Sequence, residues 1–178
     1  PLILSKHDLG RRPGAMRRVR LVVPAPDALG TALVGVEAGS DLVLDLRLES
    51  VLEGVLVSGT ATGTLAGECG RCLEPLDGTL TVDVQELFAY PGHEAPEGAE
   101  ELPELVGEEL DLEATVRDAI VTALPFQPVC RPECPGLCPQ CGVRLATVTG
   151  EHTHEVTDPR WAALRTLTVE SAPQDEPS

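Results

Sequence analysis

Eight side chains in this sequence have the types and the spacing of metal ligands. Six are cysteines in three close pairs, and two are histidines that follow the last pair. They are Cys69, Cys72, Cys130, Cys134, Cys138, Cys141, His152 and His154. Thiolate and imidazole suit Zn²⁺, and four such ligands complete one tetrahedral site. The count predicts two structural zinc ions, with a single ion as the alternative.

The strongest single motif is Cys138-Pro-Gln-Cys141, because Gly142 follows it. A two-residue spacer in a tight turn lets two thiolates converge on one ion, and the following glycine accepts a positive φ. Cys69-Gly-Arg-Cys72 has the same spacing without the glycine. Two histidines that lie two residues apart on an extended segment present both imidazoles to the same side.

Spacing alone does not decide which of these ligands bind the same ion. The preferred partition places Cys69, Cys72, Cys130 and Cys134 on one ion, and Cys138, Cys141, His152 and His154 on a second. One alternative is a single site of Cys130, Cys134, Cys138 and Cys141 with the first pair as free thiols. Another joins the two Cys-x-x-Cys pairs in one zinc ribbon. In each case protein fills every position, which is typical of structural and not catalytic zinc.

The charge is unevenly distributed. The 178 residues carry a net charge of −16, but residues 1–20 hold six basic residues against one acid, a net of +5. The remainder holds seven arginines and 28 acids, a net of −21. The body therefore lacks the broad basic face of a duplex-binding protein. Any contact with nucleic acid is expected from the N-terminal arm, through Arg11, Arg12, Arg17, Arg18 and Arg20.

Several classes of function are disfavoured by what the sequence lacks. No apolar stretch approaches the roughly 18 to 20 residues that span a bilayer, and no signal-peptide pattern opens the chain. Neither a phosphate-binding loop nor a Gly-x-Ser-x-Gly elbow occurs. We therefore expect a cytoplasmic, non-enzymatic protein with no membrane partner and no small-molecule substrate. Paired cysteines in a reducing compartment favour metal over disulfides.

The clearest periodicity lies at residues 42–48, where leucines at even positions alternate with Val43, Asp45 and Arg47. Period two with a polar opposite face predicts a half-buried strand. Further strands are expected at 19–23, 31–36, 55–67 and 79–90, with a reversal at Asp77-Gly78. Glycines at 59, 63 and 67 share one parity, which suggests bulges or a bend in a curling sheet.

One main helix is predicted from Asp111, a potential N-cap, to the residue before Pro125. Residues 91–109 are rich in Pro, Gly and Glu and predict an acidic loop. A short C-terminal helix is expected from the stripe of Trp161, Leu164 and Leu167.

The expected fold class is α+β: a curled antiparallel β-sheet with one main packing helix and an irregular zinc-binding C-terminal segment. The expected regions are a basic N-terminal arm (1–17), a β-rich core domain (18–126) with the acidic loop (91–109), a zinc-binding segment (127–170) and a disordered tail (171–178).

Six stretches in order carry a resemblance to a known family: 8–14, 54–59, 68–75, 110–125, 134–142 and 158–160. The most specific are Glu68-Cys-Gly-Arg-Cys-Leu-Glu-Pro75 and Cys134-Pro-Gly-Leu-Cys-Pro-Gln-Cys-Gly142. Together they resemble the YceD family, the bacterial large ribosomal RNA subunit accumulation proteins. Members with the full C-terminal block generally have Cys-x-Cys where this chain has His152-Thr-His154. Some members lack most of the cysteines, so the resemblance implies that zinc is scaffold and not the shared activity.

The resemblance implies a factor for 23S ribosomal RNA accumulation and large-subunit assembly that binds ribosomal RNA or a ribosomal protein. The acidic body favours a basic ribosomal protein, because opposite charges speed encounter. One alternative is a zinc-stabilised interaction adaptor unrelated to ribosomes. Another is a thiol redox protein, which is disfavoured because Cys69-Gly-Arg-Cys72 lies between expected strands and not in a strand–turn–helix setting.

Overall fold

The computed structural model describes residues 2–27, 29–92, 102–154 and 160, and the chain divides into two compact units, Pro1–Gly136 and Leu137–Ser178. Within the described residues, the first unit holds eight strands and one α-helix, and the second holds one 3-10 turn, η1 (Leu145–Thr147). The architecture is α+β and mostly antiparallel, as predicted. The expected C-terminal helix and tail lie outside the described residues.

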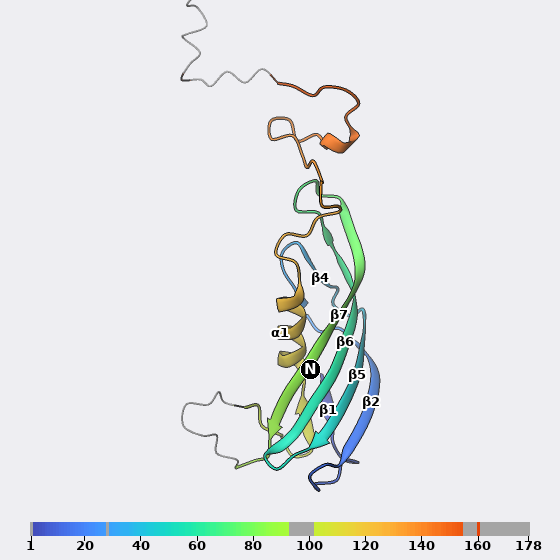
Figure 1. Ribbon diagram of the computed structural model, residues 1–178, viewed down its shortest axis with the longest axis vertical. Helices are drawn as coiled ribbons and strands as arrows, with labels where there is room; N and C mark the ends of the chain where they lie inside the picture. The colour runs from blue at the N-terminus through green and yellow to red at the C-terminus, as the bar shows by residue number, and fades with distance from the viewer. Residues whose placement is uncertain (1, 28, 93–101, 155–159, 161–178) are drawn as a thin grey trace, which may run out of the picture. The chain divides into compact units, whose positions relative to one another are not determined.

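The first unit is built from a chain of strands followed by one helix (Figure 1). The strands are β1 (Ile3–Ser5), β2 (Met16–Pro24), β3 (Leu29–Gly30), β4 (Val34–Val36), β5 (Asp41–Ser50), β6 (Gly54–Glu68), β7 (Pro75–Ala89) and β8 (Glu109–Asp111). The helix is α1 (Glu113–Ala123).

The larger sheet has the strand order β2-β5-β6-β4-β3, and β7 also pairs with β6. Every pairing is antiparallel. Because β7 pairs with β6 along its whole length, β5 and then β4 share the other edge of β6. Strands β2, β5, β6 and β7 lie side by side in Figure 1. A second, two-stranded sheet pairs β1 with β8.

The predicted alternation on β5 is confirmed. Leu42, Leu44, Leu46 and Leu48 are at most 1% exposed, whereas Asp45 and Arg47 between them are exposed. Alternate side chains of a strand face opposite sides, so one side of β5 enters the core and the other meets solvent.

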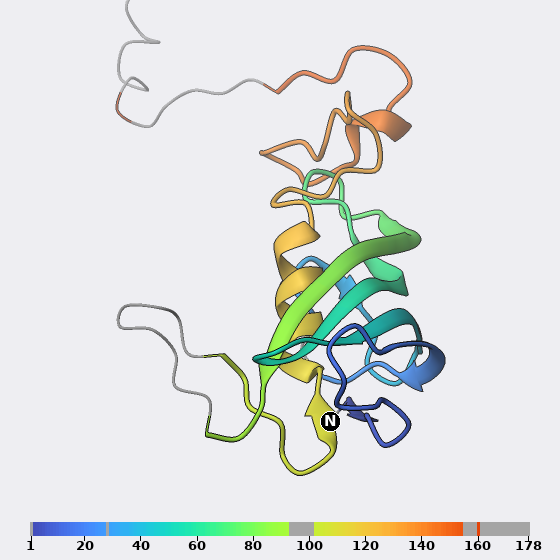
Figure 2. The same ribbon diagram turned by 60° about the horizontal axis from the view of Figure 1, so that its bottom comes forward.

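Helix α1 contacts β7 and β3, and Figure 2 shows it beside the sheet. Its buried residues are Val116 and Ile120, one turn apart, and each contributes roughly 1.5 to 3 kcal/mol by burial. The carboxylate of Asp111 accepts the N–H of Glu113 at 2.9 Å, which supplies one hydrogen bond to the open first turn.

The predicted curl of the sheet is wrong. The pairings of β6 with β5 and with β7 run without a skipped residue, so the three glycines of β6 produce no bulge. They instead permit close approach of neighbouring strands. At Gly59 (φ +154°) an added Cβ would lie 2.1 Å from the carbonyl oxygen of Asp45, and at Gly67 it would lie 2.3 Å from that of Leu33.

The predicted reversal at Asp77-Gly78 is also wrong. Both residues lie within β7, where Asp77 is opposite Ala66 and Gly78 is opposite Leu65. The chain reverses earlier, between Glu68 and Pro75, through the turn that carries the first cysteine pair. That turn closes a hairpin with 15-residue strands, so its cysteines sit at one end of the sheet.

Parts of the expected arm and acidic loop are packed. In the arm, β1 pairs with β8, and Leu2 and Leu4 are each 7% exposed. In the loop, Leu105 is 3% exposed, and its N–H donates to the carbonyl of Ala89. Residues 93–101 of the predicted loop lie outside the described residues. None of the helices in the described part of the chain is long and apolar enough to cross a bilayer.

Candidate metal centres

The two Cys-x-x-Cys segments form the same backbone turn. In the first, the N–H of Leu73 donates to the carbonyl of Cys69, whose own N–H donates to the carbonyl of Glu74. In the second, Gly142 and Cys138 make the same two bonds, with Val143 as the last acceptor. The residue after the second cysteine has a positive φ in both, +56° at Leu73 and +71° at Gly142.

A third cysteine segment meets the first turn within the Pro1–Gly136 unit. It leaves α1 through a proline-rich stretch and brings Cys130 and Cys134 to the end of the β6–β7 hairpin. The N–H of Gly70 donates to the carbonyl of Pro128 at 2.8 Å. The Arg71 guanidinium donates to the carbonyl of Cys134 at 3.2 Å. In both bonds the acceptor is a backbone carbonyl of this segment, which ties the segment to the turn.

Four sulfurs therefore form one cluster, which we call the all-cysteine site: Cys69, Cys72, Cys130 and Cys134. All four Sγ atoms lie within 4.8 Å of one another, with Cys69 to Cys134 at 3.9 Å and Cys72 to Cys130 at 3.7 Å. Four sulfurs at 2.3 Å from one Zn²⁺ would be roughly 3.8 Å apart, whereas a disulfide requires about 2 Å. The donor set and its spacing fit a tetrahedral ion.

Burial and hydrogen bonding shift the pKa values of two thiols in the all-cysteine site in opposite directions. Burial alone would raise the pKa of Cys69, but backbone N–H groups, that of Arg71 first, lower this pKa to about 6. Burial and then the neighbouring sulfurs raise the pKa of Cys130 to about 12. Four thiolates at this spacing repel one another, and a divalent cation among them would offset that repulsion.

The second cluster, which we call the cysteine–histidine site, lies in the Leu137–Ser178 unit and contains Cys138, Cys141, His152 and His154. The Sγ of Cys141 is 3.3 Å from Nε2 of His152, whose distance to Nε2 of His154 is 2.8 Å. Two nitrogens on one tetrahedral Zn²⁺ would be roughly 3.3 Å apart, so the two imidazoles lie slightly closer together than an ion would hold them. Backbone N–H groups of Cys141 and then Gln140 lower the pKa of Cys138 to about 6.

These two clusters group the eight side chains as the preferred partition does. Neither the site of Cys130, Cys134, Cys138 and Cys141 nor the joint ribbon of both Cys-x-x-Cys pairs appears among the described residues. The two sites differ in exposure. In the all-cysteine site Cys69, Cys72 and Cys134 are at most 4% exposed and only Cys130 is exposed. In the cysteine–histidine site only Cys138 is buried, whereas Cys141 and His154 are exposed.

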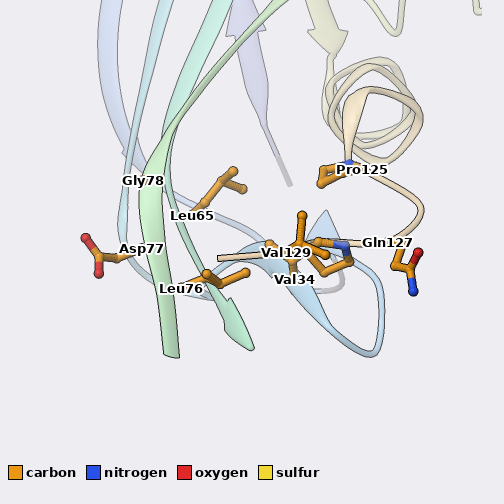
Figure 3. Close-up of a pocket in the computed structure, with 9 residues that line it drawn as sticks. Val34, Leu65, Leu76, Asp77, Gly78, Pro125, Gln127 and Val129 are labelled. Atoms are coloured by element: carbon orange, nitrogen blue, oxygen red, sulfur yellow. The ribbon is translucent and has the colours of Figure 1, made fainter. Parts of the chain in front are cut away.

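A groove of about 260 Å³ lies next to the all-cysteine site. Pro125 and Val129, from the stretch after α1, face Leu65 and Leu76 of the β6–β7 hairpin across it (Figure 3). Leu76 and Val129 also pack against the buried cysteines. The position of the segment that carries Cys130 therefore helps to shape one wall of this groove.

The five candidate RNA-binding arginines do not share one surface. Arg17 lies 3.3 Å from a carboxylate oxygen of Asp8, and Arg11 lies over the ring of Tyr90, 5.6 Å from its centre. Arg12 is exposed. Arg18 and Arg20 are exposed on the opposite face of β2 from Arg17, where Arg20 is opposite Asp45 and Arg18 is opposite Arg47.

Sequence reasoning missed two residues of the all-cysteine site and one near the arginines. In the sequence, Arg71 and Leu73 stood out only as neighbours of cysteines. Leu73 occupies the position that Gly142 has in the second turn, and this difference was the one signal of a strained φ. Arg47 was assigned only to the polar face of its strand. Its proximity to Arg18 depends on the β2–β5 register, which no local pattern supplies.

Comparison with known proteins gives one family and several relatives. Residues 57–168 match the family model described as large ribosomal RNA subunit accumulation protein YceD. Uncharacterised proteins of Mycobacterium bovis and of Mycobacterium tuberculosis strain H37Rv are each 51% identical over 166 residues, which is 92% of this chain and 80% of each relative. An uncharacterised Mycobacterium leprae protein is 42% identical over 176 residues, 98% of this chain and 81% of the relative. No solved structure gives a significant match.

Proposed function

The chain belongs to the YceD family of large ribosomal RNA subunit accumulation proteins, and we propose that it is a non-enzymatic factor that supports 23S ribosomal RNA accumulation and large-subunit assembly in the cytoplasm. The family match carries this proposal. It covers most of β6, all of β7 and α1, and both cysteine clusters. The factor would act by binding ribosomal RNA or a ribosomal protein.

The proposal includes two structural Zn²⁺ ions, one in each cluster. Cys69, Cys72, Cys130 and Cys134 would hold the first, and Cys138, Cys141, His152 and His154 the second. Each ion would receive four protein ligands, which leaves no position for a reacting water. The ion in the all-cysteine site would fix the stretch after α1 to the end of the β6–β7 hairpin. Zinc then contributes folding energy and not chemistry.

The partner can be ribosomal RNA or a basic ribosomal protein. For RNA, the candidate contacts remain Arg11, Arg12, Arg17, Arg18 and Arg20. Phosphate contacts would make such binding fall steeply with salt concentration. The net charge of −16 supports the protein partner, because a strongly acidic body attracts cations and repels phosphates.

Deleting the family member in a bacterium that carries it, and then expressing this chain, tests the proposal. We expect the deletion to lower the ratio of 23S to 16S ribosomal RNA and the large-subunit peak in sucrose gradients, and we expect this chain to restore both. The matched control is the Cys72→Ser/Cys134→Ser chain, which is expected to restore neither. An unchanged ratio after deletion would contradict the ribosomal role and favour the unrelated adaptor.

A further inference from the structure

A second groove lies at the other end of the hairpin from the all-cysteine site, beside the two-stranded sheet. It measures about 250 Å³, and its apolar lining consists of Ile3, Phe88, Pro103 and Val106. Phe88 is 1% exposed and belongs to the core, whereas Ile3 is 53% exposed and Val106 is 78% exposed. Two aliphatic side chains therefore remain in solvent beside a hollow that reaches a core residue.

Carboxylates form the remainder of the lining. Glu104, Glu109 and Asp111 are all exposed and line the groove with no cation among the lining residues. In the described part of the chain, neither Glu104 nor Glu109 forms an ion pair. The adjacent Glu108 lies 3.9 Å from the ammonium of Lys6, the only lysine of the chain. The rim is therefore strongly negative.

Backbone hydrogen bonds hold the groove in place. Val106 and Glu109 exchange two N–H···O bonds of 3.1 Å across a tight turn that contains Gly107 at φ +66°. Leu105 is buried, and it anchors this turn to the end of β7 through the carbonyl of Ala89. An exposed valine on such a turn costs little to order on binding, because the backbone is already fixed.

From this groove we propose a docking surface for a basic polypeptide segment, in which one apolar side chain enters between Ile3 and Val106 and flanking Lys or Arg side chains meet Glu104 and Glu109. The volume is below the roughly 300 to 1,000 Å³ of small-molecule sites, so it suits a side chain better than a metabolite. The negative rim would repel nucleic acid. Opposite charge at the rim adds specificity and speeds encounter.

The inference rests on the proposed function and narrows its partner to a basic protein. It also explains the placement of the acidic residues of 102–109. The adjoining sequence adds Glu94, Glu97, Glu100 and Glu101, which increases the negative charge of this part of the chain.

Fluorescence anisotropy with three labelled probes tests the surface on the full, zinc-loaded chain. The probes are a short Lys/Arg peptide with one central Leu, the same peptide with Gly for Leu, and a short single-stranded RNA. We expect the Leu peptide to bind most tightly and the RNA not to bind. Glu104→Gln/Glu109→Gln should weaken the Leu peptide about threefold to tenfold, with the loss shrinking as salt rises.

One further variant tests the apolar contact, and a control variant tests whether the loss of any two exposed carboxylates weakens binding. Val106→Ser should weaken the Leu peptide about threefold to tenfold and leave the Gly peptide within about twofold. Glu37→Gln/Asp83→Asn removes two exposed carboxylates elsewhere and should change either affinity by less than about twofold. Equal losses in rim and control variants would overturn the proposal, as would RNA binding that survives the rim changes, or no binding of the Leu peptide.

Failure of this surface is distinguishable from failure of the proposed function. The Glu104→Gln/Glu109→Gln chain would be expressed in the deletion strain beside the unchanged chain. If both restore 23S ribosomal RNA equally, the ribosomal role stands and the groove is not its partner site. If the unchanged chain binds the Leu peptide but does not restore 23S ribosomal RNA, the surface stands and the ribosomal role does not.

Discussion

The two cysteine turns share one backbone path, but their surroundings differ. The first turn closes a long hairpin, and three of the four sulfurs of the all-cysteine site are nearly or fully buried. The second stands in a unit whose described part holds only one 3-10 turn, and its site includes exposed ligands. The comparison suggests that the same local motif serves two purposes. In the all-cysteine site it forms a small buried cluster of its own beside Leu76 and Val129, and in the cysteine–histidine site it brings together ligands of a largely exposed segment.

Chemistry reinforces this contrast. Three buried thiols in the all-cysteine site leave little access for competing ligands, whereas the exposed Cys141 and His154 of the cysteine–histidine site can be reached by water and chelators. The all-cysteine site also has a clamp, because Arg71 bonds to a carbonyl of the opposite ligand segment. The equivalent position of the second turn is Gln140. We therefore expect the all-cysteine site to bind its ion more stably.

The largest expected effect comes from removing one ligand in each site. Cys72→Ser should lower the free energy of unfolding of the Pro1–Gly136 unit by about 4 kcal/mol or more, because the proposed ion would lose one of its four ligands. Cys141→Ser should change that free energy by less than about 1 kcal/mol. Urea unfolding followed by far-ultraviolet circular dichroism measures both, and zinc analysis should give one ion per chain in each variant. Equal destabilisation by the two variants would contradict the contrast.

The rates at which a chelator removes the two ions should differ by about tenfold or more, and the ion of the cysteine–histidine site should leave first. Two of the six thiols, those of Cys138 and Cys141, should become reactive first, and the remaining four should follow slowly. Thiol titration during treatment with excess chelator gives the two phases. A single phase of six thiols would show that the sites are equally labile, and six reactive thiols before treatment would exclude bound metal.

Local patterns in the sequence predicted the parts of the fold that local physics decides. The alternating leucines of β5 and the spacing of Val116 and Ile120 each mark one buried face, and both predictions are confirmed. The reversal predicted at Asp77-Gly78 was wrong, because the cysteine turn a few residues earlier already reverses the chain. Across an antiparallel hairpin the register follows from the turn, so β7 continues through Asp77-Gly78 opposite β6.

Long-range pairing could not be predicted. Ile3 and Asp111 are register partners far apart in the sequence, and three-residue strands have too few positions to show a period. The groove beside Val106 depends on this pairing and was missed for the same reason. The candidate metal sites were more predictable, because ligand type and spacing restrict how four side chains can meet. Which pairs lie together became clear only from the three-dimensional position of the stretch after α1.

Backbone strain offers a third comparison of the two turns. Leu73 adopts φ +56°, where a leucine costs roughly 1 kcal/mol more than a glycine, and it is 49% exposed. Leu73→Gly should therefore stabilise the Pro1–Gly136 unit by about 1 kcal/mol. Gly142→Ala, at φ +71° with no atom within 4 Å of the added Cβ, should weaken zinc binding at the second site by a similar amount. Urea unfolding and competition with a zinc indicator measure these changes. Loss of stability in Leu73→Gly would instead indicate that the leucine side chain makes contacts worth more than its strain.

The last pair of variants isolates the clamp that only one site has. Arg71→Ala removes the bond to the carbonyl of Cys134 and should destabilise the Pro1–Gly136 unit by about 0.5 to 1.5 kcal/mol. Gln140→Ala alters the equivalent position of the second turn, where an exposed amide should contribute less than about 0.5 kcal/mol. Paired urea titrations of the two variants, together with the chelation rate of the slow phase, measure the difference. Because the guanidinium bonds to backbone at the end of the ligand segment, its removal should also speed release of the last four thiols. If Arg71→Ala leaves both the stability and that rate unchanged, burial alone accounts for the stronger site.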